Sequence, residues 1–233
     1  MNCIVFGANS SLGTNIIEEL SKKNYKILSI SRSEVIIRKK NIEHINYNKI
    51  DKEFFDKYYK VVDNFFNKKI DVFFYLATIR DEEFEINHNN LNLIDEIFNV
   101  NSINCIKFIE YNLSKLLFKK THIAFTSTVS TFLNLKKNIY YGSNKLQTEF
   151  FLKSLSLKYP NLNVCIYKLG YINTKKNIKK KLFFPKSKII NIRNFIIKGI
   201  FKHNGTKIYP YFWIIIYYII KITPKKLIYF FYK

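Results

Sequence analysis

The chain has 233 residues, a length that a single large hydrophobic core can serve, and 48% of them are hydrophobic, which excludes a disordered chain. Its formal net charge of +22 is a value typical of proteins that bind nucleic acids or anionic membranes. Lys, Asn, Ile, Phe and Tyr all have A/T-rich codons and are all abundant, so codon bias gives a second explanation of the charge. No nucleic-acid-recognition motif accompanies the charge, and we therefore expect no nucleic-acid partner.

The cysteines and the first residues indicate a reducing compartment. Cys3, Cys105 and Cys165 lie far apart in apolar surroundings and have no metal-binding or redox spacing. The first residues enter an apolar run directly and lack the basic and long apolar regions of a signal peptide. We expect reduced core cysteines, no metal site and a cytoplasmic protein.

Strand and helix patterns alternate along the chain. Short apolar runs predict six buried strands, at residues 3–6, 25–31, 42–47, 71–77, 123–126 and 164–169. Apolar residues at helical spacing predict helices over residues 11–23, from an N-cap at Asp51 onward, and over 90–119, 141–157 and 189–202. This alternation predicts the α/β class, with one doubly wound parallel sheet covered by helices on both faces. We expect residues 1–233 to form a single domain.

A glycine-containing loop separates the first strand from the first helix. Glycines in such a loop let the backbone approach a pyrophosphate, and the helix N-terminus supplies free N–H groups. The loop departs from the usual three-glycine form because Ser11 stands at the middle glycine position. We nevertheless predict a dinucleotide site formed by Gly7, Asn9, Ser10, Ser11, Leu12 and Gly13.

The end of the second strand suggests which cofactor is bound. An acidic residue at this point would bind a ribose 2′-hydroxyl, whereas an arginine accommodates a 2′-phosphate. The strand ends Ser31-Arg32-Ser33 without a carboxylate. The pattern favours NADP(H) over NAD(H), although Arg32 is also compatible with a solvated surface charge.

Tyr141 and Lys145 are four residues apart, so that both fall on one face of a helix that begins near Tyr141. An ammonium beside a phenol favours the phenolate and lowers the phenol pKa. Such a tyrosine can protonate a carbonyl oxygen while hydride arrives from elsewhere.

With a nucleotide loop at one end and Tyr141 and Lys145 far downstream, the chain resembles the short-chain dehydrogenase/reductase family over residues 1 to about 174. Ala77 is retained from the family's Asn-Asn-Ala-Gly strand end, and the segment 169–174 resembles the family's Pro-Gly-x-x-x-Thr motif without its proline. The resemblance implies cofactor contacts by Ala77, Lys145, Ile172 and Thr174.

The same resemblance implies a catalytic set. Asn101 matches the asparagine that kinks a helix and holds a relay water. Thr128, thirteen residues before Tyr141, stands at the family's catalytic serine, with Ser127 as the alternative. The catalytic residues implied are therefore Tyr141, Lys145, Thr128 and Asn101.

The substrate is less well defined by the sequence. The non-glycine middle of the loop and the apolar, lysine-flanked C-terminal segment are similar to keto-sugar reductases of cell-envelope polysaccharide synthesis. A soluble ketone, a 3-ketoacyl thioester and a nucleotide-linked sugar are equally compatible. A different class of function is a catalytically weak NADP-binding sensor or scaffold of the same fold.

The segment 203–233 contains an apolar run at residues 211–220, which is shorter than the roughly 20 residues that span a bilayer. It predicts either a helix packed on the sheet or a partner subunit, or a peripheral contact at the inner face of the membrane. The family resemblance also implies a homo-oligomer, a dimer or tetramer formed through residues 90–118 and 141–157.

Overall fold

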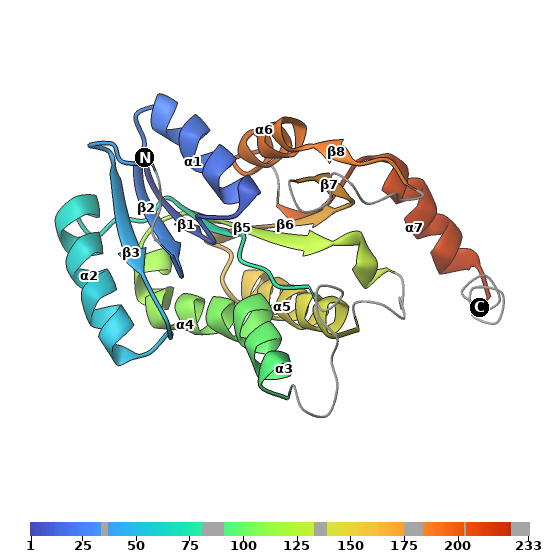
Figure 1. Ribbon diagram of the computed structural model, residues 1–233, viewed down its shortest axis with the longest axis horizontal. Coiled ribbons are helices and arrows are strands. Elements are labelled where there is room, and N and C mark those ends of the chain that lie inside the picture. Colours follow the sequence, from blue (N-terminus) through green and yellow to red (C-terminus); the bar gives the residue numbers. More distant parts are fainter. Residues whose placement is uncertain (34–36, 81–90, 133–138, 175–183, 203, 225–233) are drawn as a thin grey trace.

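The computed structural model describes residues 1–233 except 34–36, 81–90, 133–138, 175–183, 203 and 225–233. A sheet of seven parallel strands forms its centre, in the order β3-β2-β1-β4-β5-β6-β9 (Figure 1). The strands are β1 (Asn2–Phe6), β2 (Lys26–Ser31), β3 (Ile42–Asn46), β4 (Val72–Tyr75), β5 (Thr121–Thr128), β6 (Leu162–Leu169) and β9 (Gly205–Tyr209). Two short strands, β7 (Ile172–Asn173) and β8 (Ser187–Lys188), pair separately.

Helices cover both faces of the sheet, as Figure 1 shows. One face packs against α1 (Ser11–Lys22) and α6 (Ile189–Gly199). The other packs against α2 (Lys52–Phe66), α4 (Asn104–Leu117) and α5 (Ile139–Lys158), with α3 (Leu91–Phe98) beside α5. The predicted doubly wound α/β fold is thereby confirmed.

Strand residues alternate between two cores. In β1, Cys3 and Val5 belong to the core under α1 and α6, whereas Ile4 and Phe6 belong to the core under α2, α4 and α5. Because both faces are covered, every residue of β4 and β6 is buried. This explains why β4 is apolar throughout and why β6 is mostly apolar, with Asn163 and Lys168 as its polar residues.

Phe108 of α4 lies at the centre of an aromatic cluster. Its ring centroid lies 4.7 Å from that of Phe73 in the sheet, 5.1 Å from that of Tyr58 on α2 and 5.8 Å from that of Phe6. The side chain is fully buried. Phe108 therefore joins α2 and α4 to the same part of the sheet.

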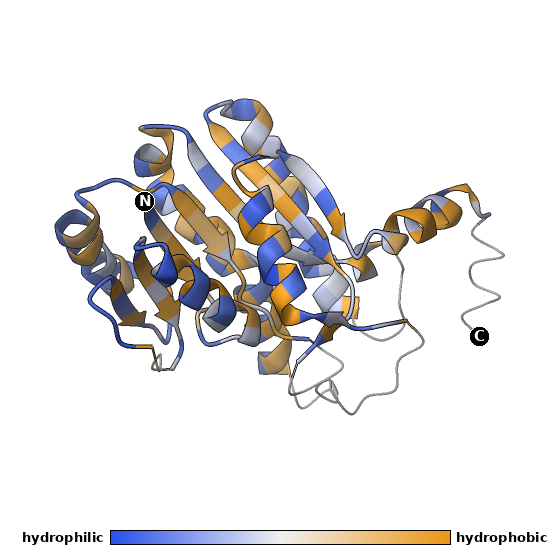
Figure 2. Cartoon of the chain, turned by 90° about the horizontal axis from the view of Figure 1, so that it is seen from above, coloured by the Kyte–Doolittle hydropathy of each residue, from blue (hydrophilic) through white to orange (hydrophobic). Residues whose placement is uncertain are grey.

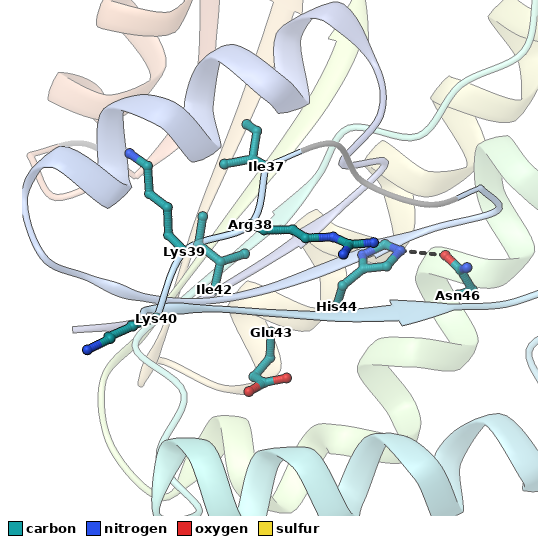
Figure 3. A pocket seen from close by; sticks show the side chains of 8 residues that line it. All are labelled: Ile37, Arg38, Lys39, Lys40, Ile42, Glu43, His44 and Asn46. Atoms are coloured by element: carbon teal, nitrogen blue, oxygen red, sulfur yellow. Dashed lines mark hydrogen bonds between the residues drawn. The ribbon is translucent and has the colours of Figure 1, made fainter.

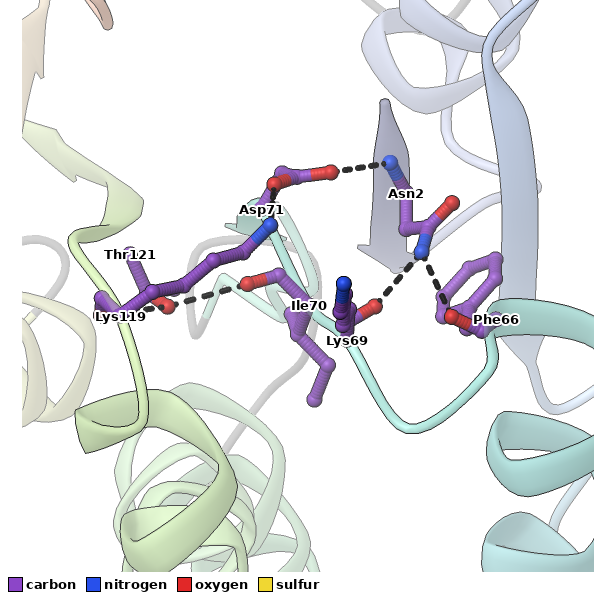
Figure 4. A network of polar contacts seen from close by, with 7 residues as sticks. All are labelled: Asn2, Phe66, Lys69, Ile70, Asp71, Lys119 and Thr121. Carbon is purple, nitrogen blue, oxygen red and sulfur yellow. Dashed lines mark hydrogen bonds and ion pairs between the residues drawn. The ribbon is translucent and has the colours of Figure 1, made fainter.

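The edge of the sheet where the strands begin is held by a polar network (Figure 4). The Asn2 backbone N–H donates to the Asp71 carboxylate at 2.7 Å, and Lys119 forms an ion pair with the same carboxylate. Burial acts to raise the pKa of Asp71, but the hydrogen bonds from Lys119 and Asn2 outweigh it and hold the pKa below its usual value. The Thr121 hydroxyl donates to the Ile70 carbonyl at 3.0 Å, so β1, β4 and β5 begin from one connected group.

Most predicted elements occur within a few residues of their expected bounds, and Asp51 caps α2 by accepting from the Phe54 N–H at 3.1 Å. The predicted helix over 90–119 is interrupted by a π-helix, η2 (Asn99–Ile103). The strand β9 was not predicted, because it is short, lies at the sheet edge and has no buried residue.

The last described helix, α7 (Phe212–Ile222), extends from the body of the molecule (Figures 1 and 2). Figure 2 shows that most of its residues are hydrophobic. Within the described residues, no helix has the length and hydropathy needed to cross a membrane.

We predict that Phe108→Ala lowers the free energy of unfolding by about 3–5 kcal/mol, because it leaves a cavity inside the aromatic cluster. Urea unfolding followed by far-UV circular dichroism would measure this. Phe118→Ala, which removes a mostly exposed ring just after α4, should change the value by less than about 0.5 kcal/mol. Equal effects of the two substitutions would contradict the assigned core.

Candidate active site

The backbone of the turn between β1 and α1 packs so closely against neighbouring backbone that two of its positions have no room for a side chain. Gly7 has φ of +88°, and a Cβ there would lie 2.5 Å from the backbone nitrogen of Ala77. A Cβ on Gly13 would lie 2.4 Å from the Gly7 carbonyl oxygen. Both positions therefore require glycine, one for its backbone conformation as well as for space.

Polar side chains fix the same turn. The Ser10 hydroxyl accepts from the Gly13 N–H at 2.9 Å and donates to the Gly7 carbonyl at 2.8 Å, capping α1. The Asn9 amide donates to the Ser33 carbonyl at 2.8 Å, which joins the turn to the segment after β2. Ser11 is exposed and Leu12 is buried at the first positions of α1. The turn lies between β1 and β4, where the strand order reverses and doubly wound sheets bind ligands.

Arg32 lies directly after β2 and forms an ion pair with Glu96 of α3. Both side chains are about half exposed, at 51% and 46%. The Ser31 hydroxyl donates to the Ser33 carbonyl. Arg32 is thus next to Ser33, which the Asn9 amide joins to the turn, and its guanidinium is held by the Glu96 carboxylate.

Lys145 is buried on α5, one helical turn after Tyr141. Its ammonium donates to the Ala77 carbonyl at 3.4 Å and lies 4.7 Å from the Phe125 ring centroid and 6.0 Å from that of Tyr141. Burial lowers the pKa of Lys145 from 10.5 to about 8, and Cys105 and Glu149 oppose this effect. The residue pair that the sequence singled out is therefore brought together, and Ala77 connects it to Gly7.

Asn101 is fully buried within the π-helix η2. Its side-chain amide donates to the Ile79 carbonyl at 2.7 Å and its side-chain oxygen accepts from the Ile79 N–H at 2.8 Å. The Asn101 backbone carbonyl accepts from the Thr148 hydroxyl of α5 at 3.3 Å. The irregular helix predicted at this residue is present, and it joins the segment after β4 to α5.

Thr128 ends β5 and caps a short 3₁₀ helix, η3 (Val129–Thr131). Its hydroxyl accepts from the Ser130 N–H at 3.1 Å and contacts the Ser130 hydroxyl at the same distance. A Cβ on Gly142 would lie 3.8 Å from the Ser130 carbonyl, so this loop lies beside the first turn of α5, next to Tyr141. The alternative residue, Ser127, instead donates to the Glu149 carboxylate inside the protein.

A buried ion pair beneath this loop was missed by the sequence reasoning. The ammonium of Lys168, at the end of β6, lies 2.8 Å from the Glu149 carboxylate of α5. It also donates to the Thr131 hydroxyl at 2.5 Å, and Thr131 donates to the Thr128 carbonyl at 2.8 Å. The available sequence signal was a glutamate one turn after Lys145, on the helix face that faces the sheet. The pair connects β5, α5 and β6 below Thr128.

Ile172 and Thr174 follow β6, on the side of α1 and α6. Ile172 is half-buried in β7 and packs against the core under those helices, and Thr174 is half-buried after it. A Cβ on Gly170 would lie 2.3 Å from Nε1 of the buried Trp213 of α7. The segment predicted to contact the nicotinamide is therefore packed against the C-terminal helix.

A separate cavity of about 610 Å³ lies along the edge strand β3 (Figure 3). Its lining includes Arg38, Lys39, Glu43 and His44. None of the residues predicted for catalysis or cofactor binding lines it.

The arrangement around Gly7 fits a dinucleotide. A helix N-terminus with a close-packed glycine turn attracts phosphate, and it lies at the point where the strand order reverses. Among the described residues, the Lys145 ammonium has one hydrogen-bond acceptor, a carbonyl at 3.4 Å. Ribose hydroxyls would provide further acceptors. The chain thus offers an anion-binding turn and a buried cation, joined by Ala77.

Comparisons with known proteins agree with this geometry. The family model for short chain dehydrogenases matches residues 2–182. The chain therefore belongs to the short-chain dehydrogenase family and is an NAD(P)-dependent oxidoreductase of that class. A search of curated proteins found no match.

Solved structures share the fold at low sequence identity. A short chain dehydrogenase from Burkholderia cenocepacia in complex with NADP has a TM-score of 0.82 and 12% identity, with 97% of this chain and 94% of that chain covered. An alcohol dehydrogenase from Thermococcus sibiricus complexed with 5-hydroxy-NADP has a TM-score of 0.72 and 15% identity, with 89% and 94% covered. The aldohexose dehydrogenase of Thermoplasma acidophilum has a TM-score of 0.73 and 15% identity, with 89% and 91% covered.

We predict that Lys145→Met stabilises the cofactor-free protein at pH 7. The folded-state pKa of about 8 lies below 10.5, so the folded chain binds this proton less tightly than the unfolded chain. The cost of the buried ammonium, about 3 kcal/mol for a shift of this size, is full below pH 8 and disappears as the pH rises towards 10.5. Denaturant unfolding should therefore show a gain at pH 7 that shrinks at high pH.

Lys198→Met, at an exposed position of α6, is the control for that measurement. It should change the free energy of unfolding by less than about 0.5 kcal/mol at either pH. A Lys145→Met protein less stable than the wild type at pH 7 would show that the ammonium is better satisfied than its contacts indicate.

Proposed function

We propose that the protein is an NADPH-dependent reductase that delivers hydride to a ketone, with Tyr141 as the proton donor. The observation that carries this proposal is the contact set of Lys145. Its buried ammonium lies between the Tyr141 ring and the Ala77 carbonyl, and Ala77 packs directly on Gly7 of the nucleotide turn. The acid and the cofactor turn are thus parts of one packed unit.

In this mechanism the bound NADPH supplies the hydride. Tyr141 donates its proton to the oxygen that becomes an alkoxide, and the Thr128 hydroxyl donates a hydrogen bond to the same oxygen. The Lys145 ammonium stabilises the phenolate that remains and binds the ribose hydroxyls of the cofactor. Asn101, fixed against Ile79, would hold a water that returns a proton to the site.

We predict that Tyr141→Phe reduces the rate of NADPH oxidation by more than tenfold, and typically by 10² or more, because the proton donor is removed. NADPH binding, measured by cofactor fluorescence, should remain near that of the wild type. A panel of ketones that includes keto-sugars would supply the substrate for the rate measurement.

Tyr140→Phe is the matched control, since it removes the neighbouring hydroxyl and should keep turnover within about twofold. A Tyr141→Phe protein that keeps more than a tenth of the wild-type rate would refute the assignment of the acid. Absence of NADPH oxidation by the wild type with every ketone, with binding retained, would favour the sensor or scaffold instead.

We further propose that Arg32 selects NADP(H) by binding the 2′-phosphate. The residue follows β2, and the Asn9–Ser33 hydrogen bond holds the segment after β2 against the nucleotide turn. In the structure its guanidinium is paired with Glu96, whose side chain is about half exposed. Binding of the phosphate would exchange one anionic partner for another.

Arg32→Ala should raise the KM for NADPH by about tenfold and leave the KM for NADH nearly unchanged, because only NADPH carries the extra phosphate. Steady-state kinetics with both cofactors would measure the two KM values and the ratio between them. Glu96→Gln frees the guanidinium and should not weaken NADPH binding. If both substitutions raise the two KM values equally, Arg32 acts only as a surface ion-pair partner.

As substrate we propose a keto-sugar of surface polysaccharide synthesis. One structural neighbour is by name an aldohexose dehydrogenase, so the fold accommodates sugars in at least that protein. The non-glycine residue Ser11 in the turn and the apolar C-terminal helix support the same class. Turnover of keto-sugars at least tenfold faster than of simple aliphatic ketones would be expected.

We also propose that residues 1–233 act as one cytoplasmic domain that assembles into a dimer or tetramer, with residues 203–233 contacting the inner face of the membrane. Exposed apolar side chains on α4 and α5 support assembly, because they form a surface suited to a second copy. They are Tyr111 on α4 and Leu146, Phe150 and Leu157 on α5.

A further inference from the structure

One face of α7 carries an unpartnered apolar stripe. Ile215, Tyr218, Ile219 and Ile222 follow the i, i+3, i+4, i+7 spacing of a single helix face, and each is more than half exposed. Tyr211, one turn earlier, extends the stripe and is also exposed. A face with so many large apolar side chains marks an interaction surface.

The opposite face of α7 is already occupied. The Trp213 indole packs on Gly170 after β6, and the Tyr217 ring centroid lies 4.7 Å from that of Phe132, which follows η3. The Phe184 ring packs against the same helix, with its centroid 4.6 Å from that of Trp213. The helix is therefore fixed on the loops that end β5 and β6, and its exposed stripe faces away from the protein.

These loops belong to the candidate active site. Phe132 follows Thr128 by four residues, and Gly170 begins the segment that carries Ile172 and Thr174. Parallel strands end at the same edge of the sheet, so α7 lies at the edge where a substrate enters. Whatever the stripe binds is brought close to this entrance.

The part of the chain that carries this surface has charges of one sign in its sequence. No Asp or Glu occurs after Glu149, whereas residues 150–233 contain 18 Lys and Arg. The 17 acidic residues all lie in the first 149 positions. A codon bias towards lysine does not explain this, because it would act on the whole chain and would not remove acids from one part.

We propose that α7 is an interfacial helix that docks the protein on an anionic phospholipid bilayer. The apolar stripe would enter the region between headgroups and acyl chains, and exposed lysines of this acid-free part of the chain, such as Lys221 on α7, would contact the headgroup phosphates. A second copy of the chain fits this surface less well, because pairing through α7 would bring together two helices that each carry a lysine and no acidic residue. A keto-sugar carried on a membrane lipid would then be presented at the entrance, a consequence that rests on the proposed function.

The test is vesicle co-sedimentation of the full-length protein. The wild type should pellet with vesicles of phosphatidylcholine that contain about a third phosphatidylglycerol. Its affinity for pure phosphatidylcholine vesicles should be at least tenfold lower, and high salt should weaken its binding to the anionic vesicles. The variant I215S/I219S removes the centre of the stripe and should lower the affinity at least tenfold. Its NADPH binding should stay within twofold of the wild type, which shows that it folds.

The matched control is F201S. This side chain is also exposed, but it lies between α6 and the start of β9, at the opposite edge of the sheet from α7 and outside the segments proposed for assembly. This variant should bind anionic vesicles within twofold of the wild type. Equal losses in both variants, or equal binding to neutral and anionic vesicles, would overturn the proposal.

Light scattering tests the alternative that a second copy of the chain covers the stripe. If the wild type does not pellet with vesicles and I215S/I219S halves the mass of the assembly, α7 is a subunit contact and the proposal is wrong. Vesicle binding by a wild type that oxidises no NADPH with any ketone would reject the proposed function but leave the docking surface standing.

Discussion

The backbones that end β1 and β4 approach so closely that no side chain fits between them, and the site is arranged around this contact. Gly7 packs on Ala77, and Gly13 packs back on Gly7. Ala77 in turn offers its carbonyl to Lys145. The position of the nucleotide turn and the position of α5 are therefore set by the same few backbone atoms, although the two are far apart in the chain.

This part of the structure could be predicted from the sequence, because the glycines of the loop and the four-residue spacing of Tyr141 and Lys145 are local patterns that can be read without knowing the fold. The parallel sheet also follows from local patterns, since strands covered on both faces must be apolar throughout. The edge strand β9 was not predicted, because neither of its faces is fully covered and it therefore lacks an apolar run. The Glu149–Lys168 pair was not predicted because it depends on the register between β5 and β6, which places Ser127 opposite Lys168. A pairing register of this kind cannot be read from one sequence.

The buried charges around α5 are not balanced in number. Two lysines, Lys145 and Lys168, are buried near one carboxylate, Glu149, and burial lowers the pKa of both lysines. Such an arrangement is costly for folding but favourable to any negative charge that develops nearby. An ammonium kept poorly satisfied in the interior costs stability at the place where the proposed mechanism uses a cation.

The strand order has a consequence for how the molecule can be assembled. From β4 onward, each strand in the chain joins the edge formed by the strand before it: β5 on β4, β6 on β5 and β9 on β6. During synthesis the sheet can therefore grow outward in one direction, always adding the newest strand to an edge that already exists. The edge of the sheet next to α7 is completed by β9, the last of these additions, so the loops against which α7 packs come together only after β1 and β4 have paired.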